Sequence, residues 1–309
     1  MNTAYDAVVE LWGATCRVAV GSRAPVQWYA HTEQTLSPPA SRALFAVAPL
    51  SDAQAAALTD VQAQLTATFR TAGAAVDTLH VLVHPPAALT VQAPLQSTAS
   101  ASACRRALMQ QAALLTGARR AQALRLAMTA VDAPLPAPAS MQWHRGLVLP
   151  SAVYGRVDDW GAAVNADRVA IASSAAHTCD ARAPRQDSWH LGLGCHAAHT
   201  EYALWHGDTC AYLYYTPLAT TPTDRAYFAA LLLNRLGLSD AGIAAIWAYG
   251  ATAQHAATMP PIAGIQPRLA HPPHPKAMRR LHASDASSLH PLRWAGIHSI
   301  LAHTASYPD

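Results

Sequence analysis

Charge is scarce in this chain, and lysine is nearly absent. Only 13% of the 309 residues are charged, and Lys276 is the single lysine, so arginine carries almost all the positive charge. The formal net charge of +3 is small, and the basic residues are spread along the chain without forming a run. Nucleic-acid binding requires a basic patch or stripe, so the composition predicts no nucleic-acid partner.

Cysteine and long apolar stretches are also in short supply. The five cysteines are odd in number, lack any C-x-x-C spacing and are scattered: Cys16, Cys104, Cys179, Cys195 and Cys210. This pattern is typical of reduced thiols, and we expect a cytoplasmic protein. The N-terminal segment lacks the basic and apolar regions of a signal peptide, and no stretch has the length of a membrane-spanning helix, which predicts no direct membrane insertion.

About half of the residues are apolar, which is enough for two cores, and they come in ordered patterns. Between Tyr5 and Glu33, short apolar runs separated by Gly13 and by residues 21–25 predict a three-stranded antiparallel meander. A helix is expected over 51–73, because apolar residues recur there at helical spacing. A buried strand follows at 78–84, and we expect a strand at 91–95 to pair beside it.

The middle of the chain predicts a second set of elements. We expect a helix over 101–116, a proline-rich loop over 133–140, a strand over 146–150, a helix over 154–165 and a strand over 168–173. The polar segment 179–188 is interpreted as a connection between two halves of the chain.

The opening pattern then recurs. Strands are expected over 189–193, 199–206 and 209–216, and a helix capped by Thr223 or Asp224 follows and ends at Gly237. A buried strand is expected over 243–249, and a final amphipathic helix over 289–303. Both halves therefore begin with a meander, then a helix, then an apolar strand, which indicates a duplicated α/β fold.

The repeated unit resembles the actin-like ATPase superfamily. The segments that carry the resemblance are LHVLVHPPAALTVQAPLQ, LGLGCHAAHTEYALWHGDTCAYLYYTPL, IAAIWAYGATA and LHPLRWAGIHSILA. Within the superfamily the chain looks most like the bacterial actin-like proteins of pilus assembly and type II secretion, and like an uncharacterised bacterial family with the same fold.

The resemblance implies a two-lobed, ribonuclease H-like duplicate. Each lobe would be a mixed sheet that starts with a three-stranded antiparallel meander and is flanked by helices. The lobes would span residues 1–185 and 186–309, with the final helix able to pack back on the first lobe.

The resemblance also implies where nucleotide phosphates would bind, namely at two turns that read roughly Asp-x-Gly in active members. In this chain Leu11 stands in the place of the first aspartate. Glu10 comes one residue early, on the opposite face of the strand. Gly192 stands in the place of the second aspartate, and the adenosine segment keeps one glycine, Gly250. The chain therefore resembles a degenerate member without the carboxylates that organise Mg²⁺.

These departures predict a non-catalytic scaffold or assembly protein that acts through protein–protein contacts. The partner is unknown, and a homodimer stays open. We expect no catalytic residue, no metal and no cofactor, although weak ATP or ADP binding stays open. The vestigial nucleotide cleft of the protein would comprise Gly13, Ala14, Thr15, Gly194, Cys195 and Gly250. The simpler interpretation is that these glycines only make tight turns.

Two enzyme functions remain as alternatives to the scaffold hypothesis. An ATP-binding protein or kinase would need substitute carboxylates in the interlobe cleft, drawn from Asp6, Glu10, Asp187 and Glu201. A metal-dependent hydrolase would need at least three converging His, Asp or Cys side chains. Candidates close in sequence are Cys195, His196 and His199 in one segment, and His271 and His274 in another.

Two further patterns are informative. Residues 192–197 match G-x-G-x-x-A, but the following residues alternate as in a hairpin, whereas a dinucleotide site needs a helix there. Strand alternation places Tyr212 and Tyr214 on one face and Leu213 and Tyr215 on the other. These aromatic residues either pack on the sheet or form a face that docks a partner.

Overall fold

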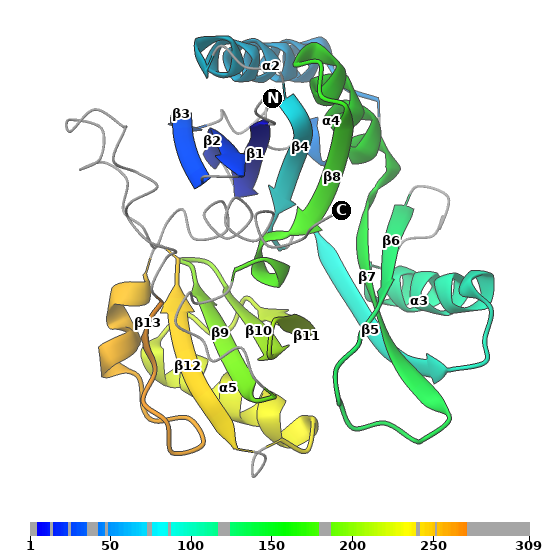
Figure 1. The fold of residues 1–309 in the computed structure, drawn as a ribbon, viewed down its shortest axis with the longest axis vertical. Coiled ribbons are helices and arrows are strands. Elements are labelled where there is room, and N and C mark those ends of the chain that lie inside the picture. Colours follow the sequence, from blue (N-terminus) through cyan, green and yellow to red (C-terminus); the bar gives the residue numbers. More distant parts are fainter. Residues whose placement is uncertain are drawn as a thin grey trace.

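The computed structural model describes residues 5–12, 15–23, 26–35, 43–46, 49–72, 76–85, 88–116, 124–178, 187–238, 242–250 and 252–270. Its first sheet has the strand order β3-β2-β1-β4-β8 (Figure 1). The strands are β1 (Tyr5–Trp12), β2 (Thr15–Arg23), β3 (Val26–Thr35), β4 (Val76–Val83) and β8 (Arg168–Ser173). The first three form the predicted antiparallel meander, and β4 and β8 continue it in parallel.

The second sheet repeats this plan, with the order β11-β10-β9-β12-β13. Its strands are β9 (Trp189–Cys195), β10 (Thr200–His206), β11 (Thr209–Thr216), β12 (Ile243–Tyr249) and β13 (Arg268–Leu269). Again an antiparallel meander is extended by parallel strands. The predicted duplication is therefore confirmed, and the strand after residue 195 excludes a dinucleotide-binding turn.

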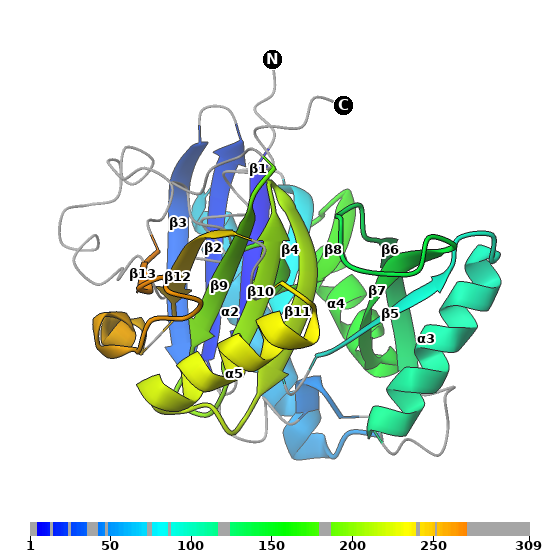
Figure 2. The ribbon, with the colours of Figure 1, turned by 90° about the horizontal axis from the view of Figure 1, so that it is seen from below.

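A third, antiparallel sheet lies between β4 and β8 in the chain, with the order β5-β7-β6. It consists of β5 (Leu89–Gln96), β6 (Leu124–Ala130) and β7 (Met141–Pro150), and α3 (Ala101–Thr116) covers one face (Figure 2). The expectation that residues 91–95 pair beside β4 is wrong, because β5 pairs with β7 instead. Local alternation identifies a strand but not its partner.

The remaining helices flank the first two sheets. They are α2 (Asp52–Ala72) and α4 (Ser151–Ala163) on the first sheet, α5 (Pro222–Arg235) on the second, and the short η2 (Ser174–Ala176) and η3 (Ala253–Thr258). The cap of α5 is Thr221 and not Thr223 or Asp224. The Asp224 backbone N–H donates to Thr221 Oγ1 over 3.1 Å, and the Thr221 hydroxyl donates to the Asp224 carboxylate over 2.6 Å, so Thr221 caps the helix and Asp224 orients its hydroxyl.

Each sheet has its own apolar core. Val9 and Val81 belong to the first, Leu191 and Trp247 to the second, and Leu108 to the third. The predicted boundary at residue 185 and the predicted helix over 289–303 lie outside the described residues. Within the ranges given above, no helix has the length and apolar character needed to cross a bilayer.

Candidate functional site

A buried histidine joins the first sheet to the second. His84 follows β4 directly, and its Nε2 lies 2.9 Å from Oε1 of Glu10 in β1. Its Nδ1 lies 2.7 Å from Oε1 of Glu201 in β10. All three residues are at most 3% exposed. The bridge therefore lies in the interior, between the two copies of the repeated unit.

Strand alternation directs Glu10 toward this bridge. Its neighbours Val9 and Leu11 point into the first core, so the Glu10 side chain leaves the opposite face of β1. Arg17 is its cross-strand partner in β2, and Arg17 Nη1 donates to Glu10 Oε2 over 3.1 Å. The Ser174 hydroxyl donates to Glu10 Oε1 over 3.0 Å. Glu10 is thus held on three sides.

Glu201 is surrounded in a similar way. His199 precedes it by two residues on the same hairpin, and their side chains meet with Nε2 3.3 Å from Oε1. His196, from the same turn between β9 and β10, places its Nε2 3.6 Å from Oε2. The Tyr249 hydroxyl in β12 donates to Oε2 over 3.2 Å. Glu201 therefore gathers three histidines, including His84, and one tyrosine.

The pKa values show how charge is arranged in this cluster. Burial alone would raise the pKa of Glu10, but the hydrogen bond and charge of His84, together with Arg17, lower it to about 2. Burial opposes the charged form of His84, but the two carboxylates raise its pKa to about 10. The pKa of Glu201 lies well below its usual value despite burial, because His84 and His196 stabilise the anion. Burial lowers the pKa of His196. The bridge is thus an imidazolium between two carboxylates.

The predicted glycine turns have a different role in the second sheet. Gly192 and Gly194 lie within β9, where their direct partners in β12 are Trp247 and Tyr249. A Cβ at Gly192 would lie 3.0 Å from Trp247 Nε1, and one at Gly194 would lie 2.8 Å from the Tyr249 hydroxyl oxygen. These two glycines therefore make room for aromatic side chains of the neighbouring strand, rather than forming turns.

Gly250 and Cys195 do come together. Gly250 has a φ of +94°, and a Cβ there would lie 2.6 Å from the Cys195 carbonyl oxygen. The buried Arg225 fastens the same region, because its guanidinium donates to the carbonyl of His196 and to the hydroxyls of Thr200 and Thr252. The backbone approach that glycine permits is used here for contacts between elements of the second half.

Of the other three predicted cleft residues, Thr15 alone belongs to the described part of the chain. Gly13 and Ala14 are outside the described residues, and Thr15 opens β2 opposite Trp12. Their placement in a nucleotide cleft stays a prediction.

Two of the four substitute carboxylates reach the junction between the sheets. Glu10 and Glu201 face each other across His84, whereas Asp6 is buried near His80 and Asp187 is exposed. The acidic pair at this junction therefore consists of two of the substitute carboxylates, Glu10 and Glu201, while Leu11 and Gly192 stand at the positions of the family's aspartates. Glu10 leaves β1 on the face opposite to Leu11, as its position in the strand predicts, and this face meets the second sheet through His84.

The structure also brings some of the predicted metal-binding residues together and leaves others out. His196 and His199 converge with His84 and Glu201, while the Cys195 thiol donates to the Leu193 carbonyl instead. His271 and His274 lie outside the described residues. The sequence does not single out His84. The spacing His196-x-x-His199-x-Glu201 does indicate that the other three side chains can converge, because they lie in one turn and at the start of the following strand.

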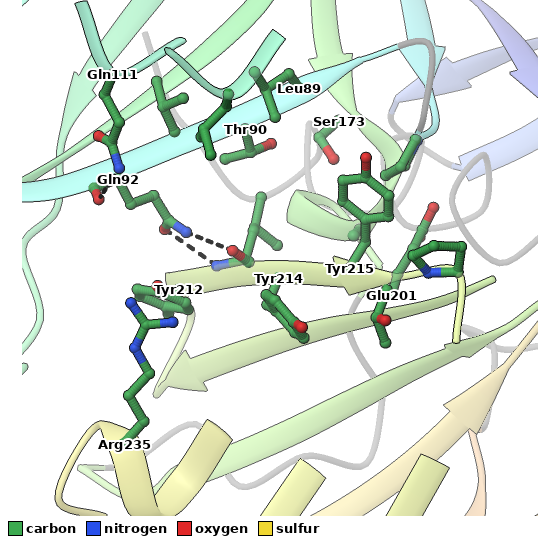
Figure 3. Close-up of a pocket in the computed structure, with 17 residues that line it drawn as sticks. Leu89, Thr90, Gln92, Gln111, Ser173, Glu201, Tyr212, Tyr214, Tyr215 and Arg235 are labelled. Atoms are coloured by element: carbon green, nitrogen blue, oxygen red, sulfur yellow. Dashed lines mark hydrogen bonds between the residues drawn. The ribbon is translucent and has the colours of Figure 1, made fainter. Parts of the chain in front are cut away.

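A cavity of about 420 Å³ opens beside this cluster, between β5, α3 and β11 (Figure 3). Glu201 and Ser173 are part of its lining, and Tyr212, Tyr214 and Tyr215 contribute one wall. Figure 3 shows Tyr215 directed from β11 toward Ser173, and Tyr214 on the other side of the strand, where its ring packs 5.7 Å from that of Tyr202. The aromatic cluster therefore combines sheet packing with a half-buried surface.

Comparisons with solved structures agree with this architecture. The PilM–PilN type IV pilus biogenesis complex contains a chain that matches with a TM-score of 0.65 and 12% identity over 99% of both chains. A Bacteroides thetaiotaomicron protein with an actin-like ATPase fold and unknown function matches with a TM-score of 0.51 and 9% identity, over 90% of this chain and 95% of that one. No protein-family model and no curated sequence matches. The chain thus has an actin-like α/β fold, as its sequence predicts.

Proposed function

We propose that this protein is a non-catalytic actin-like scaffold or assembly factor that acts through contacts with another protein. The observation that carries the proposal is the Glu10–His84–Glu201 bridge. It lies at the junction of the two repeated units, where the resemblance implies that phosphates bind, and it engages both carboxylates in protein contacts. A carboxylate that is already paired with an imidazolium is poorly placed to hold Mg²⁺.

The second phosphate turn supports the same view. Tyr249 packs against Gly194, and the turn itself presents His196 and His199 toward Glu201. Aromatic and imidazole side chains thus surround Glu201 at the position where the resemblance implies a phosphate-binding turn. The most similar of the structures described above was solved in a pilus biogenesis complex, which supports a role in assembly.

The cavity beside β11 is the proposed contact surface. It is lined by tyrosines, apolar residues of β5 and the guanidinium-bearing Arg235. Tyrosine and arginine are enriched in protein interfaces, because both combine a large contact area with hydrogen-bonding groups. We propose that a protein partner docks here.

Nucleotide binding is the direct test of the non-catalytic role. We expect no saturable heat on titration with ATP or ADP in the presence of Mg²⁺, and no Mg²⁺-dependent phosphate release. Hydrolysis that persists through purification and falls in Glu10→Gln, but not in the exposed-carboxylate control Asp208→Asn, would overturn the proposal.

That outcome would favour the second candidate, an ATP-binding protein or kinase that uses substitute carboxylates. Its specific support is that Glu10 and Glu201 lie on either side of one histidine at the junction. Hydrogen exchange distinguishes the two functions. Only the second requires the nucleotide to compete with His84 for the carboxylates of Glu10 and Glu201. ATP should then change the hydrogen exchange of the residues after β4.

A site-specific photo-crosslinker tests the contact surface. Placed at Tyr215 in the cavity, it should yield a discrete crosslinked species in the native cell, and placed at the exposed Tyr227 on α5 it should not. Equal crosslinking at both positions would contradict a docking site at this cavity.

We also propose a cytoplasmic location. The four cysteines within the described residues are buried free thiols, which is typical of a reducing compartment. Cell fractionation of the tagged chain would test this directly.

A further inference from the structure

We propose that His84, His196, His199 and Glu201 form a structural binding site for one Zn²⁺ ion that fastens the first sheet to the second. This inference goes beyond the scaffold proposal and has its own readout, bound metal, so the failure of one proposal can be told from the failure of the other. A bound zinc ion would take the place of the proton on Nδ1 of His84, and the contact with Glu201 would then run through the metal.

The donor set and its geometry support zinc. Each of the four residues offers one ligand atom, and these atoms lie within 4.8 Å of one another. Imidazole nitrogen and carboxylate oxygen are both good zinc ligands, and four protein ligands suit its tetrahedral preference. Bonds of 2.0–2.2 Å separate tetrahedral ligands by roughly 3.3 Å. Oε1 of Glu201 lies 2.7 Å from His84 Nδ1 and 3.3 Å from His199 Nε2, and Oε2 lies 3.6 Å from His196 Nε2. These separations are close to the tetrahedral spacing, so we infer that small side-chain movements would complete the site.

Residues around the four ligands provide the orientation that metal-binding histidines need. A zinc-bound histidine usually donates its other ring N–H to a carboxylate. With Nδ1 of His84 facing Glu201, its Nε2 is 2.9 Å from Glu10, and Glu10 is fixed in turn by Arg17 and Ser174. The Tyr249 hydroxyl donates to Oε2 of Glu201 and orients that carboxylate. This chain of contacts orients two of the four ligands.

The arrangement is that of a closed site. The four residues are between 1% and 5% exposed. As ligands they would complete a tetrahedral coordination shell. A catalytic zinc keeps one position for water or substrate, which this set does not provide. His84 comes from the end of β4, whereas the other three come from β9–β10 and its turn, so the ion would link the two copies of the repeated unit (Figure 1). Its role would be to hold those sheets together.

Metal analysis of untagged protein is the first experiment. A polyhistidine tag must be avoided, and the chain should be purified without chelator and measured by mass spectrometry of its metals. We expect one zinc ion per chain. After removal of the metal with a chelator, added Zn²⁺ should raise the melting temperature, and Co²⁺ should give the intense visible absorption of tetrahedral cobalt.

Three variants locate the site. His199→Gln removes a ligand and should weaken Zn²⁺ binding by more than roughly 100-fold and abolish the cobalt spectrum. Glu10→Gln keeps all four ligands but replaces the carboxylate that faces His84 Nε2, and it should weaken binding by roughly 10–100-fold while the spectrum remains. The control His255→Ala alters an exposed histidine in η3 and should leave both readouts unchanged.

The wild-type chain keeps the proposal falsifiable if a variant does not fold. Less than a tenth of an equivalent of metal, with neither a thermal shift nor a cobalt spectrum, would overturn the proposal. Zinc that is retained at full affinity in His199→Gln would also overturn it, because the ion would then be bound by other histidines of the chain.

Discussion

The Nδ1 atom of His84 lies 2.7 Å from Oε1 of Glu201, although 117 residues separate them in the chain. This contact joins the end of β4 to β10 and continues through His84 Nε2 to Glu10. Both partners are buried, so the attraction between them is not screened as it would be at the surface. The bridge is therefore a buried polar link between the two repeated units.

Removing one carboxylate from this bridge should be costly. Glu201→Gln leaves the buried imidazolium of His84 with one anion instead of two. We expect a loss of about 3–5 kcal/mol in the free energy of unfolding, which is typical when one partner of a buried ion pair is removed. Urea unfolding in the presence of chelator measures this without interference from metal.

The control for this prediction is Asp208→Asn in the exposed turn between β10 and β11, which should change stability by less than about 0.5 kcal/mol. The Glu10→Gln and Glu201→Gln changes share His84, so their effects should not add in the double variant. Strict additivity would show that the two carboxylates act separately.

Gly194 and Gly155 provide a matched pair of glycine substitutions. At Gly194 an added Cβ would meet Tyr249 atoms at 2.8 and 2.9 Å, so Gly194→Ala should destabilise the protein by about 1–3 kcal/mol. Gly155 lies exposed in α4 with no atom within 4 Å of an added Cβ, so Gly155→Ala should stabilise by about 0.5–1 kcal/mol.

Thermal unfolding of the two variants tests the prediction, and a Tyr249→Leu background tests its cause. The shorter side chain removes the atoms that collide with the new methyl group, so Gly194→Ala should cost less there. An unchanged cost would mean that the requirement for glycine comes from the Glu201 Cβ, which the new methyl group would meet at 3.0 Å, or from the strand backbone.

The sequence predicts local elements well because their causes are local. Strand alternation and turn residues delimit β11 and β12, and helical spacing between a polar start and Gly117 delimits α3. The repeated order of elements then identifies the duplicated fold. Each of these signals lies within about twenty residues of the element that it predicts.

The third sheet and the centre of the candidate site depend on contacts that are distant in sequence. β5 could pair with several apolar strands. It ends at Gln96, and its partner β7 begins at Met141, 45 positions later in the chain. From the sequence alone, His84 is predicted only as the last residue of an apolar strand. Its two carboxylate partners are 74 and 117 residues away, so no local pattern indicates that it contacts them. The spacing of apolar residues along the chain identifies an element but cannot identify a contact with a residue this distant in sequence.

The thiols of Cys16 and Cys210 should react very slowly in the folded protein. Burial, together with the nearby Glu10 carboxylate, raises the pKa of Cys16 to about 12, and burial raises the pKa of Cys210. At pH 8 the thiolate of Cys16 should be roughly 10³-fold less populated than that of a free cysteine. Iodoacetamide labelling, resolved by residue with mass spectrometry, measures this.

The same labelling in urea serves as the control, because both thiols should then react at ordinary rates. Labelling of Cys16 in native buffer at the rate seen in urea would show that the meander opens frequently, contrary to its tight burial in the first core.

Gln92 covers part of the edge of the second sheet. β11 is an edge strand, and the Gln92 amide on β5 pairs with both backbone groups of Leu213: its Nε2 donates to the carbonyl, and its Oε1 accepts from the N–H over 3.1 Å (Figure 3). Gln92→Leu removes both bonds and leaves two partly buried groups without these partners. We expect a loss of about 1–3 kcal/mol and faster hydrogen exchange at Leu213.

Gln92→Glu separates the two bonds, because a carboxylate still accepts from the Leu213 N–H but faces its carbonyl with an oxygen. The amide of Leu213 should therefore stay protected while stability falls. Gln96→Leu, at the exposed end of the same strand, should change neither quantity. If exchange at Leu213 is the same in all three variants, the contact between the third sheet and β11 is held by apolar packing and not by Gln92, and the cavity between them would keep its shape without this residue.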